Sequence, residues 1–214
     1  MEARVRTVYL DANIFKHSVR QGTREALERR QLRWGPTDVE VSISQFIEYD
    51  PTEELSNVRQ RTEAQLLASL SHYAQAGRIA FVSSIETMVE VWGLRDAQQD
   101  ARHFCGAPVS LIESPIQHSR ILINGWQRWR DMQLDFFNRV RHPRYDAFKR
   151  AFGARPTNRN LLADLFFLWT AESAQTDYFL TMDERLIRAA KGQAHLRIGC
   201  KVVTPSDLLG DLGR

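Results

Sequence analysis

Cysteine and long apolar runs are both scarce in this chain of 214 residues. Its two cysteines, Cys105 and Cys200, are too few for a disulfide framework or a CxxC metal site. No apolar stretch approaches the roughly 20 residues that a membrane-spanning helix needs. The first apolar run ends at Asp11, too early for the apolar core of a secretory signal peptide. These absences predict a reduced, cytoplasmic protein that does not enter a membrane.

Lysine is also rare, and 25 of the 29 basic residues are arginine. The net charge of the chain is only +3. The guanidinium group binds phosphate through two parallel hydrogen bonds, which an ammonium group cannot do. Residues 120–159 hold ten basic and three acidic side chains, interleaved with Trp, Tyr and Phe. This pattern suits a nucleic-acid backbone with unstacked bases, and it equally suits an amphipathic helix with an arginine-rich solvent face. The candidate substrate-binding residues are Arg139, Arg141, Arg144, Lys149, Arg150, Arg155 and Arg159.

Short apolar segments alternate with longer helical ones, which predicts an α/β fold with a mainly parallel central sheet flanked by helices. One domain accommodates the whole chain. We expect strands over 5–10, 39–43, 79–83, 178–181 and 201–203, and a loop-rich segment over 95–118. We expect helices over 14–30, 52–76, 119–140, 145–152, 160–174 and 184–190, and one containing Glu86 and Glu90.

Acidic side chains follow three of the expected strands, and a fourth lies within a helix. Asp11 ends the first strand, Glu90 follows a later one within SIETMVE, and Asp183 follows another within FLTMD. Asp164 lies within the helix LLADLFFLWTA. Ligands of an open parallel sheet bind at the carboxyl ends of its strands, so we expect the four acids to meet there. For Asp11 alone, a turn or helix cap is the alternative.

Asp164 is the most informative of the four, because its helix is apolar on nearly all sides. An unpaired carboxylate inside a buried helix is costly or stays protonated, so a cation has to compensate it. That cation is either an arginine in a structural salt bridge or a metal ion.

Two of the other acids have competing structural roles. Ser83 and Glu86 match a capping box, which leaves Glu90 as the stronger site candidate and Glu86 as a weaker one. Asp183 fits as the N-cap of the helix that follows it, unless Thr181 caps that helix and leaves Asp183 free to face a metal.

Four segments, read in order, resemble the PIN-domain nucleases, which include the VapC-type toxin ribonucleases. YLDANIF resembles the opening segment, with Asp11 as a metal ligand and Asn13 as a supporting contact. SIETMVE, DLFFLWTA and LTMD resemble the later segments, with acids at Glu90, Asp164 and Asp183 and a supporting hydroxyl at Thr181. The resemblance implies a single three-layer, PIN-like domain over 1–214, with insertions at about 35–50 and 96–157.

The resemblance also implies an activity, the hydrolysis of RNA phosphodiester bonds. Four carboxylates without Cys or His favour Mg²⁺ or Mn²⁺ over Zn²⁺. An antitoxin and a second copy of the chain are the protein partners that the resemblance implies. A DNA-directed or structure-specific nuclease of the same fold and a non-catalytic RNA-binding module are the alternatives. A haloacid-dehalogenase-type phosphatase is disfavoured, because Asn13 stands where that class needs a second Asp.

Overall fold

Strand β1 (Arg6–Leu10) lies inside a six-stranded sheet in the computed structural model, which describes residues 4–18, 22–50, 52–53, 55–92, 102–116 and 126–213. The strand order is β5-β6-β4-β1-β7-β8, and all pairings are parallel except that of β5 with β6 at one edge. The predicted α/β fold with a mainly parallel sheet is confirmed. The other strands are β4 (Ile79–Ser84), β5 (His103–Phe104), β6 (Ala107–Ile112), β7 (Tyr178–Leu180) and β8 (Lys201–Val203).

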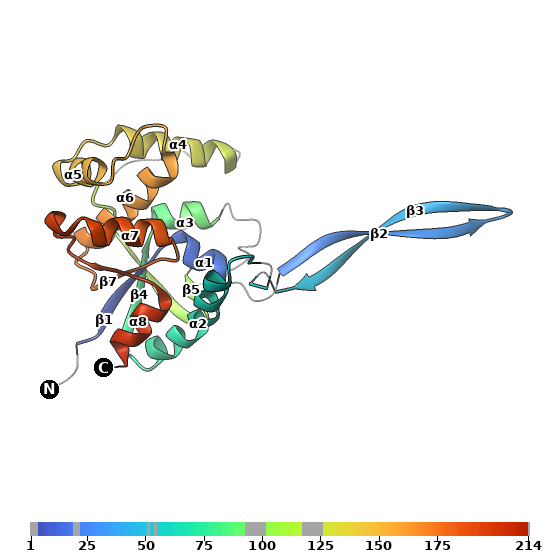
Figure 1. Cartoon of the computed structure of the whole chain (residues 1–214), viewed down its shortest axis with the longest axis horizontal. Coiled ribbons are helices and arrows are strands. Elements are labelled where there is room, and N and C mark those ends of the chain that lie inside the picture. Colours follow the sequence, from blue (N-terminus) through green and yellow to red (C-terminus); the bar gives the residue numbers. More distant parts are fainter. Residues whose placement is uncertain are drawn as a thin grey trace.

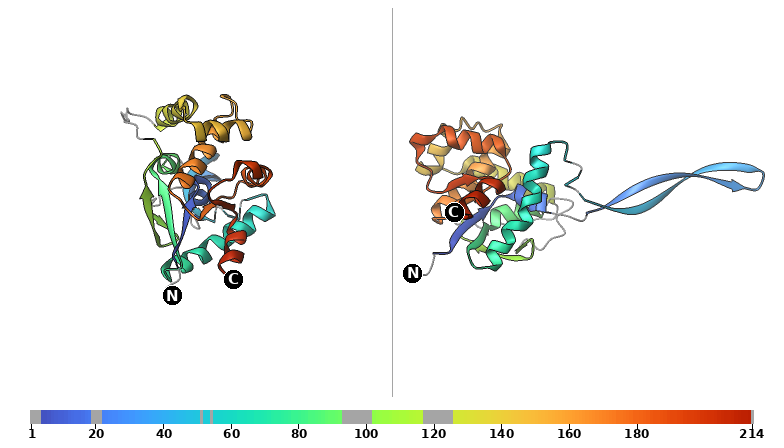
Figure 2. Two further views of the ribbon diagram at one scale, coloured as in Figure 1. Left: turned by 90° about the vertical axis from the view of Figure 1, so that its left-hand side faces the viewer. Right: turned by 60° about the horizontal axis from the view of Figure 1, so that its bottom comes forward.

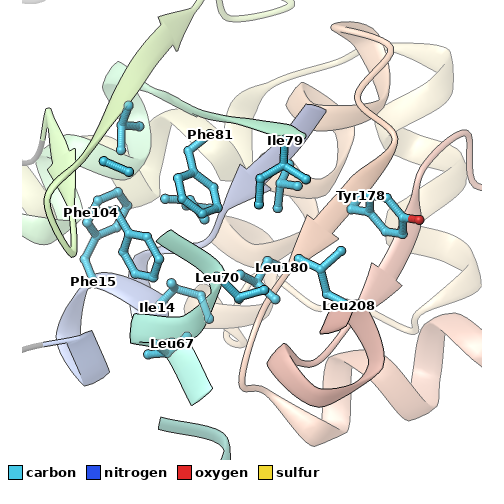
Figure 3. Close-up of a cluster of buried hydrophobic side chains, with 14 of the residues drawn as sticks. Ile14, Phe15, Leu67, Leu70, Ile79, Phe81, Phe104, Tyr178, Leu180 and Leu208 are labelled. Atoms are coloured by element: carbon cyan, nitrogen blue, oxygen red, sulfur yellow. The ribbon is translucent and has the colours of Figure 1, made fainter. Parts of the chain in front are cut away.

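Alternate side chains of the strands enter two apolar cores, one on each face of the sheet. Val8 and Leu10 of β1 belong to one core, and Tyr9 between them belongs to the other. Figure 3 shows the first core, where Ile14 and Leu70 pack beside the sheet. This core is covered by α1 (Ala12–Ser18), α2 (Val58–Gln75), α3 (Ile85–Val91) and α8 (Pro205–Leu212), and the second by α4 (Trp126–Arg139), α5 (Pro143–Ala151), α6 (Arg159–Ser173) and α7 (Glu184–Gly192).

Most of the predicted elements are confirmed to within a few residues. Helix α6 is buried on nearly all sides, as its apolar sequence predicts. Gly77 follows α2 at φ +68°, a left-handed conformation that ends a helix without steric cost for glycine. The predicted helix over 52–76 is shorter than expected, because Asn57 caps α2 through its side-chain oxygen. The first part of the predicted helix over 119–140 lies outside the described residues, and α4 covers the rest.

The predicted helix over 14–30 is wrong. Helix α1 ends at Ser18, and β2 (Gly22–Trp34) then pairs with β3 (Thr37–Tyr49) in a long antiparallel hairpin. Residues 25–33 are rich in helix-forming Ala, Leu, Glu, Arg and Gln, but cross-strand pairing overrides that weak preference. Gly35 at φ +63° turns the chain between the strands. The insertion expected at about 35–50 is therefore the second half of a hairpin that projects from the body (Figure 1).

The loop-rich segment predicted over 95–118 is wrong for residues 103–112. They form β5 and β6, which extend the sheet beyond β4. Strand β6 is short and has Pro108 as its second residue, so its sequence resembles a loop more than a strand. No helix in the described ranges is long and apolar enough to cross a membrane.

Candidate active site

The carboxyl ends of β1, β4 and β7 lie side by side, because these strands are parallel neighbours in the sheet. The chain passes from β1 to β4 on one side and later returns to β7 on the other side. Such a reversal of strand order leaves a crevice outside the strand ends. Asp11 directly follows β1, Glu90 lies in α3 after β4, and Asp183 follows β7. The structure thus brings three acids from distant segments to one edge of the sheet.

Asp11 is nearly inaccessible, with only 3% of its surface exposed. Its Oδ1 accepts the Ala12 N–H at 2.8 Å, and its Oδ2 accepts the Thr181 hydroxyl at 2.7 Å. Burial raises the pKa of Asp11 to about 7, and repulsion from Glu90 and Asp183 adds to the effect, against the lowering effect of the two hydrogen bonds. The cap and ligand hypotheses for Asp11 are therefore compatible, since it starts α1 and is also held among other acids.

Thr181 connects the ends of β1 and β7. Its hydroxyl donates to Asp11 and accepts the Asn13 side-chain N–H at 2.9 Å and the Asp183 backbone N–H at 3.1 Å. Asn13 in turn accepts the Met182 N–H at 3.1 Å through its side-chain oxygen. Both residues predicted as supporting contacts therefore fix the position of the acids around them.

Asp183 is the N-cap of α7. Its Oδ1 accepts the N–H groups of Arg185 at 2.7 Å and Leu186 at 3.2 Å. The alternative, in which Thr181 caps α7 and releases Asp183, is not what the structure has, because Thr181 bonds the Asp183 N–H instead. Both bonds to α7 use Oδ1, so the cap leaves Oδ2 of Asp183 for another partner.

Asp164 lies in the second turn of α6, within an otherwise apolar helix. Burial raises its pKa well above the usual range, and repulsion from Asp11, Glu90 and Asp183 raises it further. In the part of the chain that the structure describes, no hydrogen-bond donor reaches its carboxylate, so the structural salt bridge considered as an alternative is not found there. Asp164 is therefore the fourth member of one electrostatically linked group of carboxylates.

Glu90 has a basic partner that the sequence did not single out. Arg130 of α4 donates through Nη1 to Glu90 Oε2 at 2.7 Å and to Gln133 Oε1 at 2.8 Å. Burial raises the pKa of Glu90, and the Arg130 guanidinium acts against that rise. Arg130 also lowers the pKa of Asp164, so it is the cation that partly neutralises this group of acids. Its position depends on the packing of α4 against α3, which no sequence pattern shows.

The predicted capping role of Glu86 is wrong. Ser84 caps α3, its Oγ accepting the Thr87 N–H at 3.4 Å, because β4 continues through Ser83 and Ser84 before the helix begins. Glu86 is buried, and its Oε2 accepts the Gln133 side-chain N–H at 2.9 Å. Gln133 also donates to the Glu86 backbone carbonyl at 2.7 Å. Glu86 therefore attaches α4 to α3, and helps to position Arg130 one turn away.

Several of the predicted substrate-binding residues have partners within the protein. Arg144 forms a two-bond ion pair with Glu172, with N–O distances of 2.6 and 2.7 Å. Lys149 pairs with Asp146 at 2.6 Å. These contacts give both side chains a structural role. The others are Arg141, bonded to backbone carbonyls, Arg159, paired with Asp131 and Asp135, and the exposed Arg139, Arg150 and Arg155.

Two hollows border Asp183. One, of about 360 Å³, also borders Asp164, and its lining is mixed, with Asn158, Asn160 and Arg185 beside the apolar Phe152, Leu161, Leu186 and Ala189. The other, of about 460 Å³, is lined by Asn13, His17, Asn57, Gln60, Arg185 and Arg188. Amide and guanidinium groups beside an acidic centre suit a polyanion better than a small apolar ligand.

The donor set fits a hard divalent cation, because it consists of carboxylate oxygens whose mutual repulsion a cation would relieve. In the described part of the chain, no three acidic, histidine or cysteine side chains lie close enough to share one ion in the present arrangement. Glu90 is bound to Arg130, and Asp183 Oδ1 to α7. Ion binding therefore requires the carboxylates to move closer together and Glu90 to exchange its partner.

No protein-family model matches this chain, and no curated protein or solved structure is significantly similar to it.

Proposed function

We propose that this protein is a metal-dependent endoribonuclease with a PIN-like domain. The observation that carries the proposal is the grouping of Asp11, Glu90, Asp164 and Asp183, from four separate segments, where the strand order of a parallel sheet reverses. Raised carboxylate pKa values in a crevice are typical of functional sites. The four segments that resemble PIN-domain nucleases contain these same residues.

Asp11, Asp164 and Asp183 would hold Mg²⁺ or Mn²⁺, with Glu90 as the fourth ligand. When bound, such an ion activates water and stabilises the negative charge that develops on the phosphate. The protein's part is to keep the carboxylates oriented, through the hydroxyl of Thr181 and the amide of Asn13. Once Glu90 turns away, the Arg130 guanidinium is available to neutralise a phosphate at the rim of the site.

The two hollows beside Asp183 give a path for a single strand past the acids. Arg185 borders both hollows, so a strand that passes from one hollow to the other would stay within reach of its guanidinium group. The exposed Arg139, Arg150 and Arg155 remain candidates for contacts farther along the strand. RNA is the proposed substrate, and a DNA-directed or structure-specific nuclease is the alternative within the same chemistry. A cytoplasmic location and an antitoxin partner belong to the same proposal.

The test compares wild type with Asp164→Asn on a labelled structured RNA and on DNA of the same sequence, each with Mg²⁺, Mn²⁺ or EDTA. Asparagine preserves the shape of Asp164 and removes its charge. Asp135→Asn is the matched control, because it removes an exposed carboxylate of α4 outside the site. We expect metal-dependent cleavage by wild type and Asp135→Asn and at least about a hundredfold loss in Asp164→Asn, equivalent to about 2.7 kcal/mol.

Cleavage of the DNA alone would support the alternative substrate. Binding of RNA without cleavage in either metal would indicate a non-catalytic module and would overturn the proposed reaction. Equal cleavage by the two variants would show that the four acids are not the site.

A further inference from the structure

The larger of the two hollows beside Asp183 is formed by α1, the start of α2 and the start of α7, and we call it the α2–α7 hollow. Its volume is about 460 Å³, within the range of pockets that bind small molecules and cofactors. The β2–β3 hairpin joins α1 to α2 in the chain but projects away from the body (Figure 2), and none of its described residues lines the hollow. The walls are therefore helices of the body, so the hollow is already formed without a ligand.

The two walls of the α2–α7 hollow differ in chemistry. On the α7 wall the lining is cationic, from the guanidinium groups of the exposed Arg185 and Arg188. On the α2 wall the lining is amide, from Asn57 and Gln60. Asn57 caps α2 through its side-chain oxygen, which accepts the Arg59 N–H at 3.0 Å, so its amide nitrogen is left to donate to another partner. A nucleotide has the same division, with an anionic phosphate at one end and a base that donates and accepts hydrogen bonds at the other.

Three of the lining side chains are not used by the fold. In the part of the chain that the structure describes, the side chains of His17, Gln60 and Arg185 form no hydrogen bond or ion pair. The Gln60 amide offers a donor and an acceptor side by side, which is what the edge of a base requires. Burial and the neighbouring Lys16 lower the pKa of His17, so its ring is uncharged at neutral pH and can stack against a base.

The acids that line the α2–α7 hollow are engaged with the protein. Glu184 pairs with Arg59 at 3.3 Å, and Asp183 uses its Oδ1 to cap α7. The pair of Glu184 and Arg59 also joins the start of α7 to the start of α2, so the two walls lie within the length of one ion pair of each other at this point. Arg185 and Arg188 are the cationic groups on the α7 wall that face an anionic ligand.

We propose that the α2–α7 hollow binds one unpaired nucleotide of the RNA, with its phosphate against Arg185 and Arg188 and its base against Gln60 and His17. The inference rests on the proposed nuclease function and adds how the site selects its substrate. Because Asp183 lines the same hollow, a nucleotide bound there lies next to the group of acids. A base within a duplex has its pairing edge occupied, so the hollow admits nucleotides of single-stranded segments. The protein therefore cuts such segments, with a preference for one base at this position.

The test measures binding of the four 5′-ribonucleoside monophosphates in EDTA by titration calorimetry. Gln60→Leu removes the amide and nearly preserves the size of the side chain. Gln65→Leu is the matched control, because it makes the same change at an exposed position of the same helix outside the hollow. For wild type and control, we expect the dissociation constant of the favoured nucleotide to be at least about tenfold below that of the least favoured one, the discrimination that a paired amide supplies. Gln60→Leu should lose most of this difference.

Arg185→Gln tests the phosphate contact separately from the base contact. It should weaken the binding of all four nucleotides alike, at least about tenfold, because it removes a charged hydrogen-bond donor, and it should leave their order unchanged. Arg150→Gln, at an exposed position of α5, should leave all four dissociation constants as they are. Arg185 is exposed, so both variants should keep the thermal unfolding midpoint of wild type.

Wild type that binds none of the four nucleotides, or binds all four equally, would overturn the proposal. A base preference that survives in Gln60→Leu would overturn it as well, because another contact would then read the base. Failure of the proposed reaction gives a different result, in which wild type binds nucleotides with the expected preference and cleaves no RNA in Mg²⁺ or Mn²⁺. Cleavage of RNA by a wild type that binds no mononucleotide would refute the nucleotide pocket alone.

Discussion

Replacing Asp11 by asparagine should stabilise the metal-free protein, and the gain should depend on pH. The pKa of Asp11 is about 7 in the folded protein, against an ordinary value of 3.8. Below pH 3.8 the side chain is protonated in both states, so it has no effect on stability. As the pH rises toward 7, the unfolded chain loses this proton while the folded chain retains it, and stability falls. Above pH 7 the loss is complete.

The size of the effect follows from the rise in the pKa of Asp11 from 3.8 to about 7. Each unit of pKa is equivalent to about 1.4 kcal/mol, so the charged carboxylate lowers the free energy of unfolding by about 4 kcal/mol in all. Asparagine avoids this cost, and its oxygen can still accept the Ala12 N–H. It no longer accepts the Thr181 hydroxyl, which costs about 1 kcal/mol. The net gain at pH 8 is about 3 kcal/mol, which raises the unfolding midpoint by about 6–12 °C for a chain of this size.

The assay is thermal unfolding of wild type and Asp11→Asn in EDTA at pH 5 and pH 8. At pH 5 the two midpoints should lie within a few degrees of each other, because only about 1.7 kcal/mol of the cost is present between pH 3.8 and pH 5 and the lost Thr181 hydrogen bond offsets about 1 kcal/mol of it. Adding Mg²⁺ at pH 8 should stabilise wild type more than the variant. A difference that is the same at both pH values, or a variant less stable than wild type at pH 8, would refute the electrostatic grouping of the acids.

Two further changes test individual contacts. Arg130→Gln should increase the affinity for Mn²⁺ about tenfold in titration calorimetry, because Glu90 no longer has to leave a protein partner at 2.7 Å; an affinity that is unchanged or weaker would argue against competition. Arg144→Gln should lower the free energy of unfolding in urea by about 2 kcal/mol, since it removes a two-bond ion pair with Glu172. The exposed Arg150→Gln should leave it unchanged, and equal losses in the two variants would contradict the structural role of Arg144.

The parallel sheet could be predicted because its strands are short apolar runs, which can be recognised from the local sequence alone. Val8, Tyr9 and Leu10 face two cores and so are apolar without interruption, which is how a buried parallel strand differs from a half-exposed one. Helix α6 was predictable for the same reason, being buried on nearly every side. In both cases the local composition and the final environment agree.

The hairpin could not be predicted in full, because the local composition of its first strand and the environment of that strand in the fold disagree. The segment from Glu25 to Arg33 has the composition of a helix, and only its pairing with residues 38–46 makes it a strand. Its partner strand was partly visible in the alternation of Val39, Val41 and Ile43. The alternation predicts a half-buried strand, although the sequence could not show that Val39 and Ile43 stay exposed in the described part of the chain.

The sequence by itself determined which carboxylates are candidates, since Asp11 and Asp183 end apolar strands and Asp164 interrupts an apolar helix. The cap that Asp183 forms on α7 is local, and the sequence predicts it as well. Only the tertiary structure decided that Thr181 bonds Asp11 and that Arg130 bonds Glu90. These two partners lie in other segments, and a hydrogen bond or charge pair depends on distances of a few ångströms that only the packing of helices and strands sets.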